Sequence, residues 1–256
     1  MKMRILLSLA VLAMAMVGTT RAELIHHYTL DANADDSVGA TVYKHGYTYG
    51  AVYGPGILGG AAVFDGVDDH IDFRFERLVR TTEFTIAAWA NHFGPGGGTE
   101  HVNQIFSQRE LARGDDHSLI SLHTYATVEH ATPYAGAAIR STDGTVQTLA
   151  APVQPYNEWH HYAITVSHDY FIMYIDGVEV ARAANLQSGD YVTNIGVLAL
   201  GASSDDLSRT RYFYGAIDDV RIYDNALSPA EVMALVPEPA TVLLLGAGLC
   251  LIRRRR

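Results

Sequence analysis

Tyrosine and histidine are the residues in this sequence whose chemistry best suits a binding site. Aromatic faces stack on sugar rings, and the polar atoms of both side chains can hydrogen-bond to sugar hydroxyls. His123 and Tyr125 are two residues apart, so they would share one face of a β-strand. The alternative is cross-strand packing, because tyrosine is common in strands. We predict a binding surface from Tyr43, Tyr47, His117, His123, Tyr125 and Tyr134, with Tyr49 and Tyr53 as further candidates.

Aspartates near both ends of the chain are candidate calcium ligands. Calcium takes roughly six to eight oxygen ligands, from carboxylates and backbone carbonyls. The candidates are Asp31, Asp36, Asp65, Asp218 and Asp219, which could form one site if the first and last strands lie side by side. In the alternative, Asp36 and Asp65 only stabilise turns through their own backbone, and Asp218 or Asp219 is an exposed edge charge.

Catalytic chemistry has weaker support. A glycosidase needs two carboxylates across the scissile bond, about 5 Å apart for retention. Glu129 lacks a partner carboxylate, and Glu179 lies just after a hairpin turn. Asp68 and Asp72 have a suitable spacing but overlap a turn-forming stretch. The sequence has no Gly-x-Ser-x-Gly nucleophile motif, and its histidines do not have the spacing of a zinc site. A lyase that uses histidine and tyrosine as base and acid stays open, but we predict no enzyme activity.

The N-terminus has the pattern of a signal peptide. Lys2 and Arg4 precede an apolar run from Ile5 to Gly18, and the following Thr20-Arg21-Ala22 has small residues at the two positions that a signal peptidase reads. A charged start, an apolar stretch of this length and a small-residue end are typical of a cleaved export signal. We predict a signal peptide over residues 1–22 and a mature chain from Glu23.

The C-terminus combines a proline motif, a short apolar segment and a basic end. Residues 240–252 would form a helix about 20 Å long at ~1.5 Å per residue, against a hydrocarbon core of about 30 Å. Positive flanks stay cytoplasmic, so the bulk of the chain would lie on the far side of the membrane. The relevant residues are Pro237, Glu238, Pro239, Arg253, Arg254, Arg255 and Arg256.

This C-terminus resembles the PEP-CTERM sorting signal of bacteria that make exopolysaccharide. The resemblance covers residues 237–256. It implies a transient anchor in the inner membrane, recognition by an exosortase, and sorting to the cell envelope, outer surface or extracellular matrix.

Charge and cysteine content limit the functions of the remaining segment. Without the seven basic residues and one acidic residue of the terminal segments, residues 23–236 hold 11 basic and 27 acidic residues, a net charge of about −16. A nucleic-acid partner is unfavourable, because phosphate binding needs the opposite sign. Cys250 is the only cysteine and lies in the C-terminal apolar segment, so the domain has no internal disulfide.

Strand and turn signals recur along the whole of residues 23–236. Asp176-Gly177 lies between two apolar runs and predicts a two-residue hairpin turn. Ser228-Pro229-Ala230-Glu231 predicts one short helix to about Leu235, because serine caps, proline fits the first position and glutamate reaches back. The density of strands predicts an all-β fold with two packed antiparallel sheets. Strands are expected at 24–30, 61–64, 70–73, 84–90, 104–108, 118–125, 134–140, 145–150, 159–166, 170–175, 178–183, 197–202 and 212–223.

Four motifs in this segment resemble the LamG-like, concanavalin A-like jelly-roll domains. They are residues 65–71, 159–165, 174–177 and 215–228, in the order and spacing of that family. The resemblance implies a jelly-roll β-sandwich whose first and last strands are neighbours. It also implies that an aspartate like Asp218 binds a structural calcium ion together with backbone carbonyls near the N-terminus.

Function does not follow from this fold, which hosts lectins, adhesion modules, hydrolases and lyases. We expect an exported protein that binds polysaccharide or another matrix component. The alternatives are a glycan-active lyase or hydrolase of the same fold, and a purely structural matrix protein.

Overall fold

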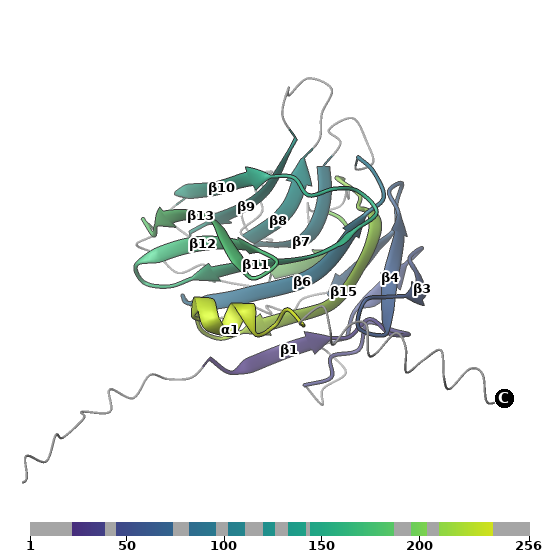
Figure 1. Cartoon of the computed structure of the whole chain (residues 1–256). Coiled ribbons are helices and arrows are strands. Elements are labelled where there is room, and N and C mark those ends of the chain that lie inside the picture. Colours follow the sequence, from purple (N-terminus) through teal and green to yellow (C-terminus); the bar gives the residue numbers. More distant parts are fainter. Residues whose placement is uncertain are drawn as a thin grey trace, which may run out of the picture.

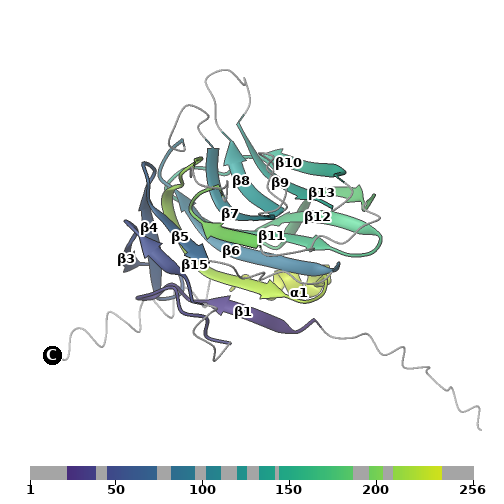
Figure 2. The ribbon, with the colours of Figure 1, turned by 180° about the vertical axis from the view of Figure 1, so that it is seen from behind.

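The computed structural model describes residues 22–38, 45–73, 82–95, 102–110, 120–125, 133–141, 144–186, 196–203 and 210–237. Within them, two antiparallel sheets pack face to face (Figure 1), and Figure 2 shows the same sandwich from behind. The prediction of an all-β jelly-roll sandwich with one short helix is confirmed.

The first sheet has eight strands. They are β1 (Leu24–Tyr28), β3 (Val52–Pro55), β4 (Gly60–Asp65), β6 (Phe84–His92), β11 (Trp159–Val166), β12 (Tyr170–Ile175), β13 (Val178–Ala184) and β15 (Tyr214–Tyr223). The strand order is β13-β12-β11-β6-β15-β4-β3, and β1 also pairs with β15. The first and last strands are therefore side by side, as the resemblance implied.

The second sheet has seven strands. They are β2 (Tyr47–Tyr49), β5 (His70–Phe73), β7 (Val102–Glu110), β8 (Ile120–Tyr125), β9 (Tyr134–Arg140), β10 (Val146–Pro152) and β14 (Gly196–Leu200). The strand order is β10-β9-β8-β7-β14-β5-β2. Strands β2 and β3 were not predicted, because their tyrosine-rich and glycine-rich sequence lacks a clear alternating pattern.

The core fills the space between the two sheets. One buried cluster contains Ile120 and Leu122 of β8 together with Phe171 and Met173 of β12, because alternate residues of a strand point to one face. Burying each large apolar side chain contributes roughly 1.5–3 kcal/mol. With the only cysteine outside residues 23–236, burial of this kind stabilises the domain.

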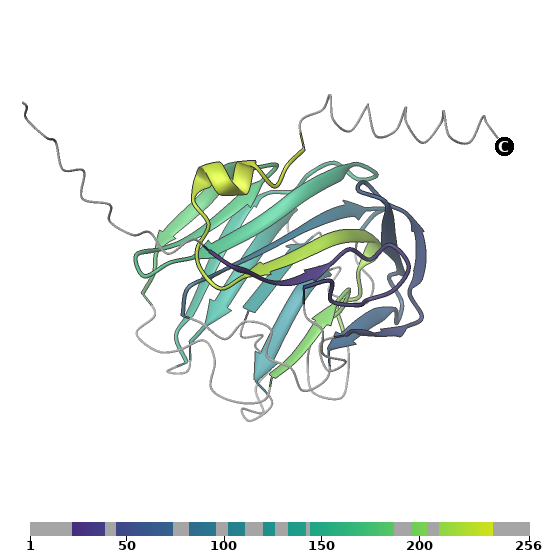
Figure 3. The same ribbon diagram turned by 90° about the horizontal axis from the view of Figure 1, so that it is seen from below.

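Two local predictions are confirmed in detail. Asp176 and Gly177 have φ values of 51° and 76°, the positive values that the predicted hairpin turn needs. Helix α1 (Pro229–Met233) begins with a capping box between Ser228 and Glu231, and it ends slightly before the predicted Leu235. Figure 3 shows α1 lying against the outside of the eight-stranded sheet, where Val232 packs on an apolar cluster.

Candidate functional site

One end of β7, β8 and β9 brings predicted binding residues together. On β8, Tyr125 pairs with Val102 of β7 on one side and with Tyr134 of β9 on the other. His123 likewise pairs with Gln104 of β7 and with Gly136 of β9. Ile120 and Leu122 on β8 point into the core, so His123 and Tyr125 lie on the other face of the sheet. The aromatic residues therefore lie on the face of the seven-stranded sheet that is turned away from the core and the eight-stranded sheet.

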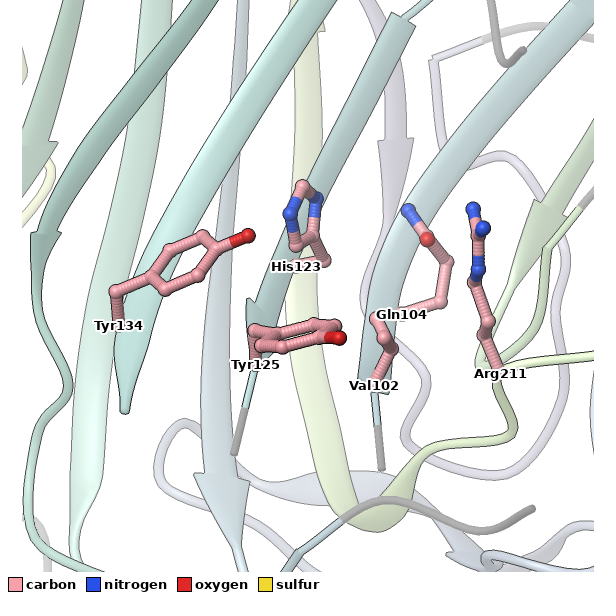
Figure 4. Close-up of a pocket in the computed structure, with 6 residues that line it drawn as sticks. All are labelled: Val102, Gln104, His123, Tyr125, Tyr134 and Arg211. Carbon is pink, nitrogen blue, oxygen red and sulfur yellow. The ribbon is translucent and has the colours of Figure 1, made fainter. Parts of the chain in front are cut away.

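These side chains line a cavity of about 400 Å³. Figure 4 shows its lining, in which Arg211 comes from the segment before β15 and joins residues of three strands. The rings of Tyr125 and Tyr134 are stacked, with centroids 5.3 Å apart and an angle of 25°. The lining residues are Val102, Gln104, His123, Tyr125, Tyr134 and Arg211.

A hydrogen-bond chain fixes the polar groups of this pocket. The amide nitrogen Nε2 of Gln104 donates to the Ser121 hydroxyl over 2.9 Å and to the Phe106 carbonyl over 2.6 Å. The Ser121 hydroxyl hydrogen-bonds in turn with Nδ1 of His123 over 2.9 Å. Because the Gln104 amide and the His123 ring are both held by hydrogen bonds, the pocket presents these polar groups in a fixed arrangement.

Gly136 gives the His123 ring room to lie over β9. A Cβ atom at residue 136 would be 2.7 Å from Nε2 of His123 and 3.0 Å from the Tyr134 ring. The imidazole therefore needs a residue without a side chain directly across from it. This requirement links the position of His123 to the identity of its cross-strand partner.

The electrostatics of the pocket are set by burial and one cation. Burial and the nearby Arg211 guanidinium lower the pKa of His123 to about 4, so its imidazole is neutral at pH 7. Burial, together with Tyr125, raises the pKa of the Tyr134 hydroxyl, which stays protonated. None of the six described lining residues is a carboxylate, so Arg211 carries the only formal charge among them at neutral pH.

His123, Tyr125 and Tyr134 were predicted from the sequence as binding residues, whereas Gln104 and Arg211 were not. Gln104 fell within a predicted strand, but a bulge between Gln104 and Phe106 changes which residues face the pocket. Arg211 has a φ of 59° and hydrogen-bonds through its carbonyl to the Gln104 N–H over 3.2 Å. No local pattern marks either residue as part of a site.

The other predicted binding residues lie elsewhere. Tyr47 is on β2, at the far edge of the same sheet, and is 57% exposed. Tyr53 on β3 hydrogen-bonds with the Thr48 hydroxyl over 2.6 Å. Tyr43 and His117 lie outside the described residues.

The five predicted calcium ligands are distributed over separate hydrogen-bond networks. Oδ2 of Asp36 pairs with His26 Nδ1 over 2.7 Å, and Oδ1 of Asp219 pairs with His27 Nε2 over 2.6 Å. Asp31 and Asp218 both hold the turn between β3 and β4: Asp31 accepts from the Gly60 N–H, and Asp218 accepts from two N–H groups of residues 57 and 58.

Asp65 instead belongs to a different acidic group. Its carboxylate lies with those of Asp68 and Asp69, with one oxygen of each within 4.8 Å of the others. Part of this geometry is turn structure, since Asp65 accepts from the Val67 N–H and Asp69 accepts from the Asp65 N–H. Burial and the two neighbouring carboxylates raise the pKa of Asp69.

The chain belongs to the concanavalin A-like lectin/glucanases superfamily, whose family model matches residues 65–233. Residues 235–256 match the PEP-CTERM protein-sorting motif, which indicates export and sorting to the cell envelope. Both resemblances identified in the sequence are thereby confirmed. Among the residues that the structure describes, which do not include 240–252, no helix is long and apolar enough to cross a membrane.

Solved structures share the fold at low identity. Domain 4 of AbnA, a GH43 extracellular arabinanase from Geobacillus stearothermophilus in complex with arabinotriose, is 23% identical with a TM-score of 0.63, covering 84% of this chain and 99% of that chain. A heptameric SAP-like pentraxin from Limulus polyphemus is 16% identical with a TM-score of 0.54, covering 68% and 80%. The CBM40 of a Ruminococcus gnavus IT-sialidase, bound to α2,3-sialyllactose, is 18% identical with a TM-score of 0.50, covering 61% and 84%.

Proposed function

We propose that this chain is an exported protein that binds carbohydrate, such as exopolysaccharide or another matrix glycan, in the pocket at the end of β7, β8 and β9. The observation that carries this proposal is the stacked pair Tyr125 and Tyr134 beside fixed hydrogen-bonding groups. Sugar recognition needs this combination, because one face of a sugar ring is apolar and its edge carries hydroxyls.

Each part of the lining has a distinct task in this proposal. The tyrosine rings and Val102 provide apolar contact area, and Gln104 and His123 offer polar atoms at fixed positions. The Arg211 guanidinium donates to ring or hydroxyl oxygens. A neutral imidazole suits hydroxyl recognition, since it offers a donor and an acceptor rather than two donors.

A binding role agrees better with the described lining than hydrolysis does. Glycoside hydrolysis needs an acid and a second carboxylate about 5–9 Å apart around the bond to be cleaved. The six described lining residues include neither. We therefore propose that the domain binds a glycan without hydrolysing it.

The terminal segments give this binding module its location. We propose that residues 1–22 direct export, that residues 23–236 form the exported domain, and that residues 237–256 anchor it transiently in the inner membrane until an exosortase acts near Pro237-Glu238-Pro239. The sorting-motif match supports this order of events. The product would be a glycan-binding protein of the envelope or matrix.

A structural calcium ion is a further part of the proposal. The Asp65, Asp68 and Asp69 carboxylates offer the hard oxygen donors that calcium prefers, and a divalent cation would relieve the repulsion between them. These three residues would hold the ion beside β5. The ion would stabilise the turn between β4 and β5 rather than touch the pocket.

The test of the binding proposal is titration of the purified exported protein with defined glycans. Calorimetry with arabino-oligosaccharides and with fragments of the producing cell's extracellular polysaccharide would measure affinity. We expect binding that the Tyr125→Ala variant loses and that the Tyr156→Ala variant keeps, since Tyr156 is a partly exposed tyrosine outside the pocket lining. Absence of binding to every glycan tested would contradict the proposal and favour a purely structural matrix role.

A lyase is the second candidate, because His123, two tyrosine hydroxyls and Arg211 line the same pocket. In a uronate-containing chain, Arg211 would stabilise the carboxylate while a neutral His123 or a tyrosine removed the proton from the adjacent carbon. The carbon–oxygen bond to the leaving sugar would break, a carbon–carbon double bond would form, and an acid would protonate the leaving oxygen. Ultraviolet absorbance of the unsaturated product, lost in His123→Ala, would establish this activity, and no absorbance change with uronate polymers would exclude it.

A further inference from the structure

A second aromatic cluster lies at the same end of the seven-stranded sheet as the pocket. It consists of Tyr49 on β2, His70 on β5 and Tyr212 from the segment before β15. The rings of Tyr49 and His70 are stacked, with centroids 4.7 Å apart and an angle of 11°, and Tyr212 lies 6.3 Å from His70. All three side chains are partly exposed.

The register places this cluster on the same face as the pocket. Ile71 and Phe73 on β5 belong to the core, so His70 points to the opposite face, and Tyr49 is its cross-strand partner. Leu200 on β14 pairs with Ile71 on one side and with Phe106 on the other. Ile71, Leu200 and Phe106 therefore form one row of paired residues across β5, β14 and β7. His70 and the pocket residue Gln104 both lie just beyond this row, at the same end of the sheet.

A single short segment connects the pocket with the cluster. Arg211 lines the pocket, and its neighbour Tyr212 contacts His70. Backbone hydrogen bonds hold this segment against the ends of β7 and β14: the Gln104 N–H donates to the Arg211 carbonyl, and the Phe213 N–H donates to the Gly201 carbonyl over 2.8 Å. The two aromatic groups are therefore joined through a fixed piece of backbone.

The orientation of His70 is also fixed. Its Nδ1 lies 2.8 Å from the Asp68 carbonyl and donates to it, which leaves the ring face against Tyr49. A ring held in this way loses little conformational entropy when a ligand stacks on it. Tyr47, two residues before Tyr49 on the same strand face, continues the aromatic row and is exposed.

We propose that the binding site extends from the pocket along the sheet end, past Arg211, to the cluster of Tyr49, His70 and Tyr212, and that it takes an internal stretch of a polysaccharide chain. This inference rests on the proposed glycan-binding function. Four strand spacings of ~4.8 Å separate β8 from β2, a span of about 19 Å that one sugar ring does not cover. The pocket would hold one sugar unit, and the cluster would form a separate stacking subsite for a later unit of the same chain.

The experiment is a length series. Fragments of the producing cell's extracellular polysaccharide, sized from one repeat to many, are titrated against the exported protein and its Tyr49→Leu variant, which keeps apolar bulk but loses the flat ring. We expect affinity to rise with length, and Tyr49→Leu to weaken long-fragment binding about 2- to 10-fold without changing short-fragment binding. Tyr49→Phe should restore the wild-type length dependence, and the surface variant Tyr156→Leu should behave as wild type.

Other outcomes distinguish a failure of the extended site from a failure of glycan binding in the pocket. Equal affinity for short and long fragments, or an unchanged length dependence in Tyr49→Leu, would overturn the extended site while leaving the pocket as a glycan site. A Tyr49→Leu variant that loses short and long fragments equally would also overturn it, because the substitution would then act on the pocket. Binding of no fragment at all would remove both proposals.

Discussion

Tyr125 and Tyr134 are direct cross-strand partners on β8 and β9, and their rings stack with centroids 5.3 Å apart. The pair lies on the face of the sheet that is turned away from the core, where stacking does not serve the packing of the two sheets. Tyr134 is in addition in edge contact with His123, at a centroid distance of 6.3 Å. The three rings therefore form one wall of the pocket.

If this wall binds sugar, truncating either tyrosine should weaken glycan affinity. We expect Tyr134→Ala to reduce affinity about tenfold, which corresponds to an aromatic contact of about 1.5 kcal/mol. Tyr134→Phe keeps the ring and should lose much less. Isothermal titration with the best-binding polysaccharide fragment measures both, and equal losses for Ala and Phe would show that the hydroxyl, rather than the ring, makes the contact.

Gly136→Ala should damage the pocket more than the fold. The added Cβ would lie 2.7 Å from His123 Nε2, so the imidazole must shift from the position in which it hydrogen-bonds with Ser121. We expect a stability loss of roughly 1–3 kcal/mol, as for other overpacked sites, and a larger relative loss of glycan affinity. Gly54→Ala is the matched control, because its Cβ would meet only the Val63 side chain at 3.5 Å. Unchanged affinity in Gly136→Ala would mean that His123 takes no part in binding.

Acid should destabilise the domain through buried histidines whose pKa is lowered. Burial lowers the pKa of His92 to about 3, and those of His123 and His161 to about 4, from an ordinary value of 6.5. The unfolded chain therefore binds more protons than the folded chain as pH falls from about 6.5 to about 4, and stability falls over that window. Well above pH 6.5 these histidines are neutral in both states and contribute no pH dependence.

Buried carboxyls with a raised pKa oppose this trend. Burial raises the pKa of Asp218 to about 6 from 3.8, so the folded state holds this proton more tightly and gains stability as pH falls from about 6 to 3.8. The raised pKa of Asp69 acts in the same direction. The three histidine shifts together are larger than these opposing shifts, so the melting temperature should fall from pH 7 to pH 4.5. The Asp218→Asn variant removes the opposing contribution and should show a steeper fall by differential scanning fluorimetry. A melting temperature that rises between pH 7 and pH 4.5 would contradict the assignment of these histidines as neutral.

Calcium should raise the melting temperature through the acidic group beside β5. A ligand that binds only the folded state stabilises it by about 2.7 kcal/mol at a hundred times its dissociation constant. We expect the calcium-induced shift, measured against EDTA, to disappear in Asp68→Asn and to persist in Asp169→Asn, an exposed aspartate elsewhere. Loss of the shift in Asp218→Asn but not in Asp68→Asn would instead place the ion at the ligand set first predicted from the sequence.

Local features of this protein could be read from its sequence because they depend on neighbouring residues. The Asp176-Gly177 turn and the Ser228 capping box need only the dihedral preferences and hydrogen bonds of a few adjacent residues, and both formed as predicted. The sorting signal and the order of the family motifs are likewise local patterns. Alternation along β8 was sufficient to put His123 and Tyr125 on one face.

The composition of the site was decided by contacts between distant parts of the chain. Arg211 reaches the pocket because strand pairing brings the segment before β15 beside β7, about a hundred residues earlier, and the bulge after Gln104 turns that side chain to the same face. The predicted aspartates were likewise divided among several networks by the positions of His26, His27 and the turn between β3 and β4. The sequence by itself determined most of the strands, the Asp176-Gly177 turn, the short helix and the C-terminal sorting motif, since these follow from local preferences. Only the tertiary structure decided which side chains share a pocket. The pairing of strands that are far apart in the chain produces no recognisable pattern in the sequence of either strand.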